Sequence, residues 1–465
     1  MSTPVVLRDP LWNTIRLSPE AVRIVDAPAF QRLRHIKQLG HAHLVYPGAT
    51  HTRFDHAIGV YHLAVRALAE LGQRGALEAV DPVERACVPI AALLHDIGHY
   101  PFSHALEELQ AERIPGHHEA LVGRFLAEPE VAAALEAVAA DAPARVEALI
   151  RGRSTSPLQG LVSGSLDLDK IEYLKRDARF CGVPYGEVDV DRLLQALMVL
   201  EDPATGAREI GVHEKGVAAL ESLLFSKYQM FRNVYWHHAV RAATVLYKRL
   251  VGDALDAGLI QREELVGATD EALMFLLAER SRAATLADAG DAADAADSAD
   301  SADSADAGGR AAGVRMATFL DAMRNRRLPK RAAEIAAAHL PGGGPGDWLE
   351  TDSPFKRAVE DRIAVELGLR AGGAFLDYPA KTAMFGLELL VLRQDGAVVR
   401  VGPGGHAGLI GLPRVADELY RTARVLRLFT LDERRVVAPE RLAELAVRSE
   451  AELTKALEAG GTLLA

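Results

Sequence analysis

Apolar residues recur at the i, i+3 and i+4 spacing of an amphipathic helix through most of the chain before residue 285. The clearest of these segments, which we predict to be helices, are 60–71, 84–95, 119–126, 188–200 and 214–254. Turn residues such as Pro47-Gly48 separate them. Between residues 200 and 213 the pattern shortens around Thr205-Gly206, which predicts a β-hairpin. The chain is therefore expected to be mainly α.

The pattern is mixed after residue 312, where helix-like and strand-like stretches follow one another. Helices are predicted at 316–325, 354–367 and 413–424. Alternating apolar residues, typical of strands, occur in AFLDYP, LELLVLRQ, AVVRVGP and RVLRLFTL. We therefore expect a smaller C-terminal α+β lobe at 313–465, in which a sheet is covered by helices.

The segment 286–312 differs from both parts because it is of low complexity. Aspartate occurs at every third position from Asp288 to Asp306, among alanine and serine. A period of three matches neither a helical nor a strand face, and the tract has no large side chain to bury. We predict a disordered surface insertion between an N-terminal region, 1–285, and the C-terminal lobe. An acidic segment that mimics phosphates is the alternative.

Composition indicates a globular protein without a general attraction for nucleic acid. Of the 465 residues, 49% are hydrophobic and 25% charged, a balance usual for folded soluble proteins. The net charge of −11 comes largely from the aspartate tract, so the rest of the chain is nearly neutral and nucleic-acid binding is not expected. Two cysteines, no secretory pattern at the start and no long apolar run favour a cytoplasmic protein that does not enter a membrane.

Two imidazoles and two carboxylates form the most informative pattern in the chain. His56 lies in HTRFDHAIGV, His95 and Asp96 in ALLHDIGHYPFSHALE, and Asp169 in SLDLDKIEYLKRD. These residue types are ligands for one divalent metal ion such as Mn, Fe, Zn or Mg, and helical folds build such centres from several helices. A single histidine is more often a hydrogen-bonded core residue, but HDxGHxPFSH with an upstream RFxH and a downstream DxDK is far more specific.

The strings RFDH, HDIGH and DLDK resemble those of the HD superfamily of metal-dependent phosphohydrolases. More narrowly, the chain resembles the deoxynucleoside-triphosphate triphosphohydrolases, which include bacterial members and vertebrate SAM-and-HD-domain enzymes. The similarity extends from about residue 9 to residue 246 and includes FQRLRHIKQLG, YPGATHTRFDHAIGV and DKIEYLKRDARFCGVPYG.

This resemblance implies a helical HD core at about 50–180 and a metal ion held by His56, His95, Asp96 and Asp169. It also implies the reaction: hydrolysis of a deoxynucleoside triphosphate (dNTP) to the deoxynucleoside and inorganic triphosphate. A metal ion with open positions suits this chemistry because it can bind both water and a phosphate oxygen.

The resemblance further implies an acid–base set around the metal. His104 is the candidate donor of a proton to the 5′-oxygen, and His99, Glu107 and His118 surround it. Histidine suits this role because its ordinary pKa lies near physiological pH. The vertebrate enzyme has an aspartate at the position of Glu107, so a carboxylate is kept there. A plain helix-surface role is the alternative for Glu107.

Substrate contacts are implied for residues that lie on or near the metal-bearing segments. Phosphate contacts are implied for Arg53, Lys170, Tyr173 and Lys227, contacts to the sugar 3′-hydroxyl for Gln38 and Asp177, and a sugar wall that excludes a 2′-hydroxyl for Tyr235. Lys227 replaces an arginine of the vertebrate enzyme and Phe231 replaces a histidine, which puts some contacts in doubt. For Tyr235 alone, ordinary helix packing is the default.

A second nucleotide site is also suggested by position. In the vertebrate relative, the matching residues recognise a guanine nucleotide that activates the enzyme by assembling a tetramer. The residues concerned are Asp26, Gln31 and Arg34, with Lys215, Arg326 and Lys330 as candidate phosphate contacts. Met198 and His213 stand where that relative has arginines, so a charged surface helix is the alternative. A homo-oligomer, dimer or tetramer, is expected.

Two other functions remain open at this point. The same fold and chemistry would serve another phosphate ester, such as a nucleoside monophosphate or a signalling nucleotide. A non-catalytic nucleotide-binding scaffold is the third hypothesis, but a degenerate domain would be expected to have lost part of the metal set.

Overall fold

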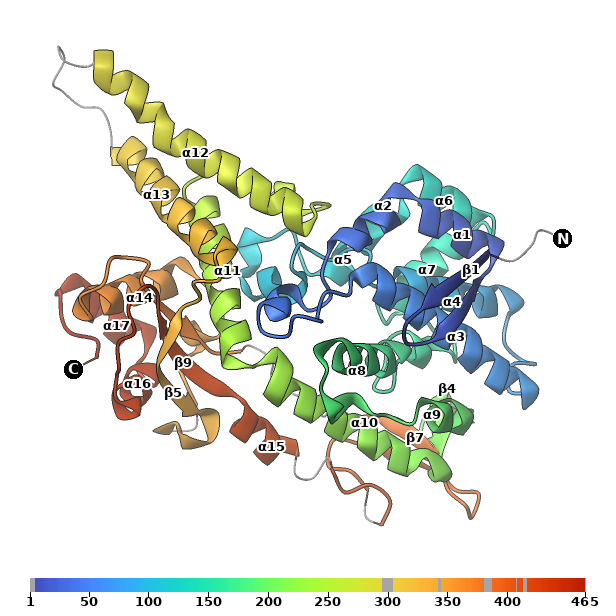
Figure 1. The fold of residues 1–465 in the computed structure, drawn as a ribbon. Coiled ribbons are helices and arrows are strands. Elements are labelled where there is room, and N and C mark those ends of the chain that lie inside the picture. Colours follow the sequence, from blue (N-terminus) through green and yellow to red (C-terminus); the bar gives the residue numbers. More distant parts are fainter. Residues whose placement is uncertain are drawn as a thin grey trace.

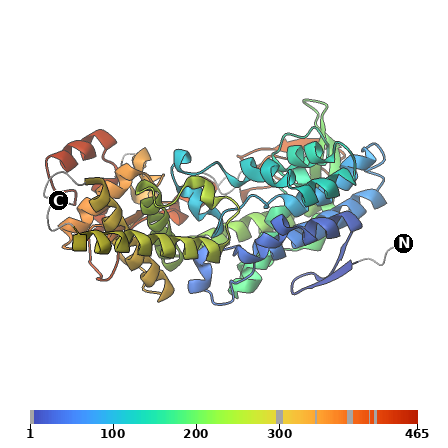
Figure 2. The same ribbon diagram turned by 90° about the horizontal axis from the view of Figure 1, so that it is seen from above.

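The computed structural model describes residues 5–294, 304–341, 344–379, 387–406, 408–412 and 416–464, with the side chains of 287–294, 304–308, 416 and 417 left aside. A helical lobe carries the N-terminal end and a smaller mixed lobe the C-terminal end (Figure 1). Seen from above, the molecule is elongated, with the two ends of the chain at opposite sides (Figure 2). The predicted fold class, mainly α with a smaller α+β region, is confirmed.

Eleven α-helices, as the structure describes them, make up the helical lobe and its connection to the second lobe. They are α1 (Pro19–Asp26), α2 (Pro28–Gln31), α3 (Arg53–Gln73), α4 (Pro82–Leu94), α5 (His118–Leu126), α6 (Pro129–Glu136), α7 (Ala142–Ile150), α8 (Leu168–Cys181), α9 (Val190–Ala196), α10 (Val217–Met230) and α11 (His238–Asp256). Short 3₁₀ segments include η1 (Arg32–His35), η2 (Gly40–Leu44), η3 (Ser103–Glu108) and η7 (Glu214–Gly216). An N-terminal hairpin, β1 (Val5–Asp9) and β2 (Asn13–Leu17), packs beside them and was not predicted.

Local sequence explains where the site-bearing helices begin. Thr52 caps α3 in a capping box with Asp55, so two backbone N–H groups at this end are satisfied by side chains. Asp167 caps α8 by accepting a hydrogen bond from the backbone of Lys170. Pro82 occupies the first turn of α4, where its missing N–H costs nothing. These starts fix which turn of each helix faces the site.

The predicted helix at 214–254 is interrupted in the structure. A π-helical segment, Phe231–Tyr235, follows α10, and Trp236 leaves the helical conformation. His237 then takes an extended conformation and caps α11 through its side chain. The predicted helix at 188–200 is also shorter, because α9 ends at Ala196 and the next residues form a strand. The prediction for 188–200 was wrong after Ala196, where pairing of β3 with β4 overrode the local pattern, and the prediction for 214–254 was wrong at the π-helical segment and the turn after it.

Two further sheets place parts of the C-terminal region. One has the order β3 (Leu197–Glu201), β4 (Arg208–His213), β7 (Leu389–Leu392) and β8 (Val398–Val401), and the other has β5 (Lys330–Ala336), β9 (Val425–Thr430) and β6 (Ala374–Asp377). The predicted hairpin around Thr205-Gly206 is present as β3 and β4. However, β7 pairs in parallel with β4, with Gly211 opposite Leu390. The predicted lobe at 313–465 is therefore not one spatial unit, since β7 and β8 lie beside α9 in the helical lobe (Figure 1).

Helix extends into the tract for which we predicted disorder. The remaining helices are α12 (Asp270–Asp294), α13 (Ser304–Arg324), α14 (Pro354–Glu366), α15 (Ala416–Ala423), α16 (Pro439–Ala446) and α17 (Glu450–Glu458). Within this tract the structure has helix up to Asp294 and from Ser304, which the high helix propensity of alanine favours. The disordered insertion at 286–312 stays a prediction. Residues 295–303 lie outside the described residues.

Most buried apolar residues of the described chain form two cores, beside one small cluster. The large core includes the N-terminal hairpin, the helices up to α13 and parts of β6, β7, β8 and β9, and the second lies between α14, α16 and the β5–β9–β6 sheet. Helix α11 spans the two lobes (Figure 1). Among the residues that the structure describes, no helix combines the length and apolar character needed to span a lipid bilayer.

Candidate active site

The four candidate metal ligands converge from three helices. His56 lies in the first turn of α3, His95 and Asp96 directly follow α4, and Asp169 lies in the first turn of α8. His56 Nε2 is 3.3 Å from His95 Nε2, 3.0 Å from Asp169 Oδ1 and 3.5 Å from Asp96 Oδ2. His95 Nε2 is 3.3 Å from Asp96 Oδ1 and 3.6 Å from Asp169 Oδ1. The structure thus brings together all four residues that the sequence singled out.

The four side chains differ in exposure in a way that gives the site an open side. The side chains of His56 and Asp96 are 0% and 4% exposed, whereas those of His95 and Asp169 are 12% and 31% exposed. His56 and Asp96 lie at the buried side of the site, and His95 and Asp169 reach the protein surface. Water and a substrate can therefore approach from the side of His95 and Asp169.

The donor set fits one divalent cation because of what the other imidazole nitrogens do. His56 Nδ1 is 2.7 Å from Glu172 Oε2, and His95 Nδ1 donates to the carbonyl of Ala92 at 2.9 Å. In a neutral ring each Nε2 then carries a lone pair, and the two lone pairs face each other beside two carboxylates. Such convergent donors are stabilised by a cation between them.

Glu172 is a functional candidate that the sequence analysis missed. Its carboxylate also accepts hydrogen bonds from Arg176 Nε at 2.8 Å and from Trp12 Nε1 at 2.9 Å, and it is fully buried. A carboxylate behind a metal-binding imidazole fixes the tautomer and the orientation of the ring. Its position three residues after Asp169, on the same helical face, was the available signal.

Electrostatics within this group keep the carboxylates charged. Burial raises the pKa of Asp96 and of Asp169, but Arg53 and His95 outweigh it for Asp96, and His56 and His95 for Asp169, so both pKa values lie well below the ordinary range. Burial lowers the pKa of His56, but Asp169 and Glu172 outweigh it and raise the pKa to about 10. The field at this point therefore favours a positive charge, whether a proton or a metal ion.

Arg53, expected to bind phosphate, also holds a candidate ligand. Its Nη1 donates to Asp96 Oδ2 at 2.6 Å and its Nε to Ser103 Oγ at 3.0 Å, and the side chain is buried. Ser103 in turn donates to the carbonyl of Lys37. Arg53 is thus fixed at the edge of the centre by a carboxylate on one side and a hydroxyl on the other.

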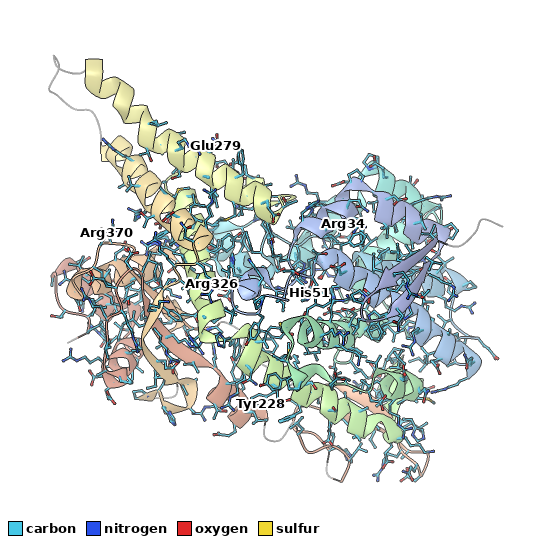
Figure 3. The ribbon with its side chains drawn as sticks, viewed as in Figure 1. Arg34, His51, Tyr228, Glu279, Arg326 and Arg370 are labelled. Carbon is cyan, nitrogen blue, oxygen red and sulfur yellow. The ribbon has the colours of Figure 1, made fainter. Side chains whose placement is uncertain are left out.

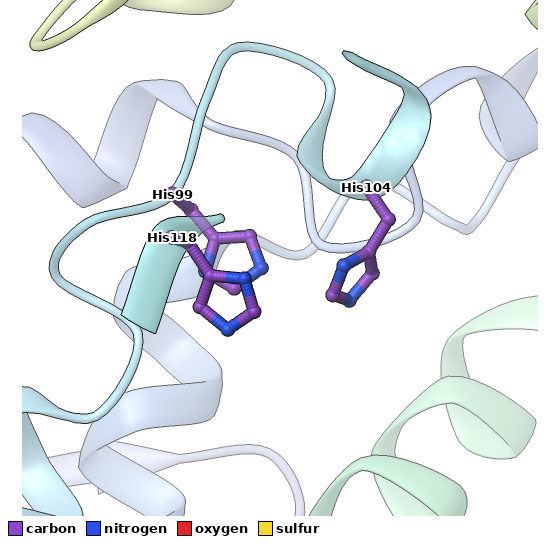
Figure 4. A group of neighbouring side chains, drawn as sticks. All are labelled: His99, His104 and His118. Atoms are coloured by element: carbon purple, nitrogen blue, oxygen red, sulfur yellow. The ribbon is translucent and has the colours of Figure 1, made fainter. Parts of the chain in front are cut away.

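The acid–base set surrounds one carboxylate. Glu107 Oε2 is 2.8 Å from His104 Nδ1, and Glu107 Oε1 is 2.6 Å from His118 Nδ1. The rings of His99 and His118 lie 3.8 Å apart, and His104 faces them (Figure 4). These three imidazoles also lie close enough together to hold a metal ion. Burial raises the pKa of Glu107, but His104 and His118 lower it far more, so Glu107 is ionised and is not a plain surface residue.

His99 joins this set to the candidate metal ligands. His99 Nδ1 is 3.2 Å from Asp96 Oδ1, and its buried Nε2 has no hydrogen-bond partner among the described residues. Burial, with help from Arg53 and His118, holds the pKa of His99 well below its usual value, which favours the neutral ring. Gly98 permits the segment that carries His99 to lie close to the start of α5, because a Cβ at position 98 would lie 2.2 Å from the carbonyl oxygen of His118.

The loop that carries His104 has an unusual backbone. Phe102 and Ser103 have φ values of 56° and 60°, a left-handed conformation that costs non-glycine residues free energy. Asp270 holds the loop by accepting hydrogen bonds from the backbone of Phe102 at 2.7 Å and of Lys37 at 3.0 Å. Strain that surrounding contacts maintain is frequent at functional sites.

The predicted sugar contacts form a second buried cluster. Asp177 Oδ2 accepts a hydrogen bond from Tyr235 at 2.6 Å, and its Oδ1 lies 2.8 Å from His51 Nε2. Gln38 is also buried, and its backbone N–H donates to the carbonyl of His51. The side-chain Oε1 of Gln38 has no hydrogen-bond partner among the described residues. The sequence analysis did not single out His51, yet its side chain contacts Asp177 and its backbone carbonyl accepts from Gln38.

The remaining predicted phosphate contacts are on α8 and α10. Lys170 donates to the carbonyl of Gly164 at 2.9 Å and pairs with Asp167. Tyr173 is half-buried, with its ring 6.4 Å from that of Tyr235. Lys227 is buried on α10. Lys170 would have to release Asp167 to bind a phosphate.

The predicted second nucleotide site is not assembled within one chain. Arg34 lies at η1 in the helical lobe, with its Nε donating to Gln31, and Arg326 lies apart from it, two residues after the end of α13 (Figure 3). Asp26 and Lys330 are exposed on α1 and β5. Lys215 lines a different feature, a pocket of about 230 Å³. Its other lining residues are Arg74, Arg192, Gln195, Ala196, Met198 and His213.

Comparisons with known families agree with this geometry. The HD domain model matches residues 53–159, and the model of an HD-associated region matches residues 188–292. The first range contains His56, His95 and Asp96, together with His99, His104, Glu107 and His118, and ends ten residues before Asp169.

Curated relatives match about half of the chain. An uncharacterised protein of Methanocaldococcus jannaschii is 34% identical over 273 residues, which cover 58% of this chain and 54% of that protein. YwfO of Bacillus subtilis is 34% identical over 253 residues, covering 54% and 56%. Human deoxynucleoside triphosphate triphosphohydrolase SAMHD1 is 30% identical over 268 residues, covering 51% and 42%. The matched parts thus span about half the length of these relatives.

Solved structures share the fold over nearly the whole chain. A hypothetical protein from Aquifex aeolicus has a TM-score of 0.63 at 24% identity, covering 97% of this chain and all of that one. A phosphohydrolase from Bacteroides thetaiotaomicron has a TM-score of 0.66 at 20% identity, covering 92% and 100%. Part of the chain matches the HD domain model and a following part the HD-associated model, and the chain resembles metal-dependent phosphohydrolases, among them the deoxynucleoside-triphosphate triphosphohydrolases.

Proposed function

We propose that this protein hydrolyses dNTPs to the deoxynucleoside and inorganic triphosphate, in the cytoplasm. The observation that carries the proposal is the convergence of His56, His95, Asp96 and Asp169 beside the His104–Glu107–His118 set. Similarity to dNTP triphosphohydrolases supports the choice of substrate.

The reaction places water on the α-phosphorus and breaks the bond from that phosphorus to the 5′-oxygen. A divalent ion held by the four ligands would polarise the α-phosphate and lower the pKa of a bound water. His104, held at Nδ1 by Glu107, presents Nε2 as the donor of a proton to the departing 5′-oxygen. Arg53 would supply hydrogen-bond donors beside the α-phosphate. The neutral ring of His99, whose Nδ1 donates to Asp96, would offer its Nε2 as an acceptor.

The sugar cluster supports a deoxyribose substrate. Asp177 and Gln38 offer acceptor oxygens for the 3′-hydroxyl, and Tyr235, which donates to Asp177, would lie against the sugar and exclude a 2′-hydroxyl. Burial beside Asp177 and Tyr173 raises the pKa of Tyr235 well above its usual value, so it stays a hydrogen-bond donor. Lys170, Tyr173 and Lys227 complete the phosphate contacts in this proposal.

The test is a product profile. Purified protein with Mn²⁺ or Mg²⁺ is incubated separately with dNTPs, ribonucleoside triphosphates and nucleoside monophosphates. The proposal predicts free deoxynucleoside and inorganic triphosphate from dNTPs, with little turnover of the others. Release of single phosphates, or turnover of monophosphates only, would favour another phosphate ester, and no turnover of any would favour a nucleotide-binding scaffold.

A guanine nucleotide as activator is a second part of the proposal. The pocket beside Lys215 supports anion binding, because Arg74, Arg192 and Lys215 are three cations around one cavity. The separation of Asp26, Gln31 and Arg34 from Arg326 and Lys330 within one chain suits a site completed between copies in a homo-oligomer. Adding GTP or dGTP to a dATP assay should therefore raise both the rate and the mass of the particle. An unchanged rate and mass would leave the six residues with structural roles.

A further inference from the structure

Two adjacent glutamates at the end of η3 point to different parts of the molecule. Glu107 holds His104 and His118, as described above. Glu108, the next residue, faces α11, where its two oxygens accept hydrogen bonds from Arg241 at 2.7 and 2.8 Å and from Lys248 at 2.7 Å. The segment that positions the acid–base set is therefore tied to the helix that spans the two lobes.

Arg241 continues the connection into the C-terminal lobe. Its Nε donates to both oxygens of Asp377 at 3.0 and 3.1 Å, and its Nη2 lies 2.5 Å from Asp377 Oδ1. Asp377 is the last residue of β6 and is fully buried, and Arg241 is buried as well. One rigid guanidinium fork thus joins two carboxylates, one from each lobe, with little freedom for either.

A backbone connection runs beside this ion pair. The N–H of Gln110 donates to the carbonyl of Asp352 at 3.2 Å, and the N–H of Asp352 donates to the carbonyl of Glu108 at 3.0 Å. The Asp352 side chain is in turn held by Arg357 of α14 at 2.5 Å. The chain that leaves η3 is therefore paired along its backbone with the segment that enters α14.

We propose that the C-terminal lobe positions the acid–base set, through Asp377, Arg241 and Glu108. Glu108 and Arg241 are positioning residues: they touch no substrate but fix η3, so that His104 stays beside His99, which contacts Asp96. This goes beyond the proposed function, because it holds for any phosphate ester that the site cleaves. It also gives the C-terminal lobe an indirect part in the reaction, through the position of η3.

The experiment uses the full-length protein with Glu108→Gln and Arg241→Lys. Glu108→Gln keeps the size of the side chain, and Arg241→Lys keeps its charge but loses the fork, so the fold has the best chance of surviving. The matched control is Asp361→Asn, because Asp361 accepts a hydrogen bond from Arg249 of α11 at 2.8 Å but does not contact η3. All three variants weaken the junction, by which we mean the contacts of η3 and α11 with the C-terminal lobe. Only Glu108→Gln and Arg241→Lys, the η3 variants, change a contact of η3.

Two readouts separate positioning from general stability. Amide hydrogen exchange needs no substrate, and it should become faster over 103–118 in the two η3 variants while staying unchanged there in Asp361→Asn. With the substrate found in the product profile, kcat should fall by about tenfold to a hundredfold with KM and metal content nearly unchanged, since small displacements of a catalytic group have effects of that size. Unchanged exchange over 103–118 in the η3 variants, or a kcat within twofold of the parent, would overturn the inference. If dNTPs prove not to be substrates, the exchange result still decides it.

Discussion

The candidate metal centre and the junction between the lobes both bury several charged groups, but they satisfy them differently. At the junction two buried arginines of α11 are paired with carboxylates: Arg241 with Glu108 and Asp377, and Arg249 with Asp361. At the centre, two imidazole Nε2 atoms lie 3.3 Å apart beside the carboxylates of Asp96 and Asp169. Potential metal-ligating atoms that face each other, with no positively charged side chain between them, indicate a cation-binding site. Complete arginine–carboxylate ion pairs indicate a structural contact.

The largest effect is expected when the centre itself is removed. His95→Ala combined with Asp96→Ala deletes two of the four ligands, so activity should fall by about a thousandfold or more. Hydrolysis assays and metal analysis of the purified protein measure the loss, and circular dichroism confirms that the helices persist. Substantial turnover by a folded double variant would show that the reaction occurs elsewhere.

A smaller effect on metal binding is expected at Glu172, which contacts the candidate ligand His56. Glu172→Gln removes the charge that orients His56, and metal affinity should weaken about tenfold to a hundredfold. Titration calorimetry with Mn²⁺ measures this. Glu187→Gln serves as the control, because the Glu187 side chain is 87% exposed. Equal affinities for the two variants would reduce Glu172 to a packing role.

His51 sharpens the comparison for the sugar cluster. In this account it orients Asp177, so His51→Gln should reduce the preference for a dNTP over its 3′-deoxy analogue by about tenfold, the size expected for one weakened hydrogen bond. The ratio of kcat/KM values for the two substrates measures this preference. A fall in both values at an unchanged ratio would mean that His51 supports the fold and does not set specificity.

The smallest effect is expected at the junction and depends on pH. Burial raises the pKa of Glu360 to about 7, although Arg249 and Lys356 oppose it. The folded state therefore holds a proton more tightly than the unfolded state, and stability falls as pH rises between about 4.5 and 7. Glu360→Gln should remove this fall, so that its stability differs less between pH 5 and pH 8 than that of the parent. Parallel urea unfolding curves at pH 5 and pH 8 test this, and an identical pH dependence of the two proteins would contradict it.

The two regions also differ in how far the sequence predicts them. The metal candidates lie in short strings, HDIGH and DLDK among them, whose spacing on helices can be recognised without the fold. Glu172 has the same kind of signal, three residues after Asp169, but a carboxylate inside a helix is usually at the surface. The contacts of Arg241 with Glu108 and with Asp377 have no local signal, because each joins residues more than 130 positions apart.

Most helices of the first 285 residues follow from the apolar pattern, since their buried faces recur at helical spacing. The π-helical segment at Phe231–Tyr235 does not, because the side chains there look like those of a continuous helix. The placement of β7 beside β4 depends on pairing between distant strands, which periodicity does not specify.

The central claim is that water attacks the α-phosphorus of a dNTP and that the triphosphate leaves intact. Turnover of dATP in ¹⁸O-labelled water, followed by mass spectrometry of the products, tests it most directly. The account predicts one labelled oxygen in inorganic triphosphate and none in deoxyadenosine. Label in deoxyadenosine, or in a released monophosphate, pyrophosphate or single phosphate, would contradict it.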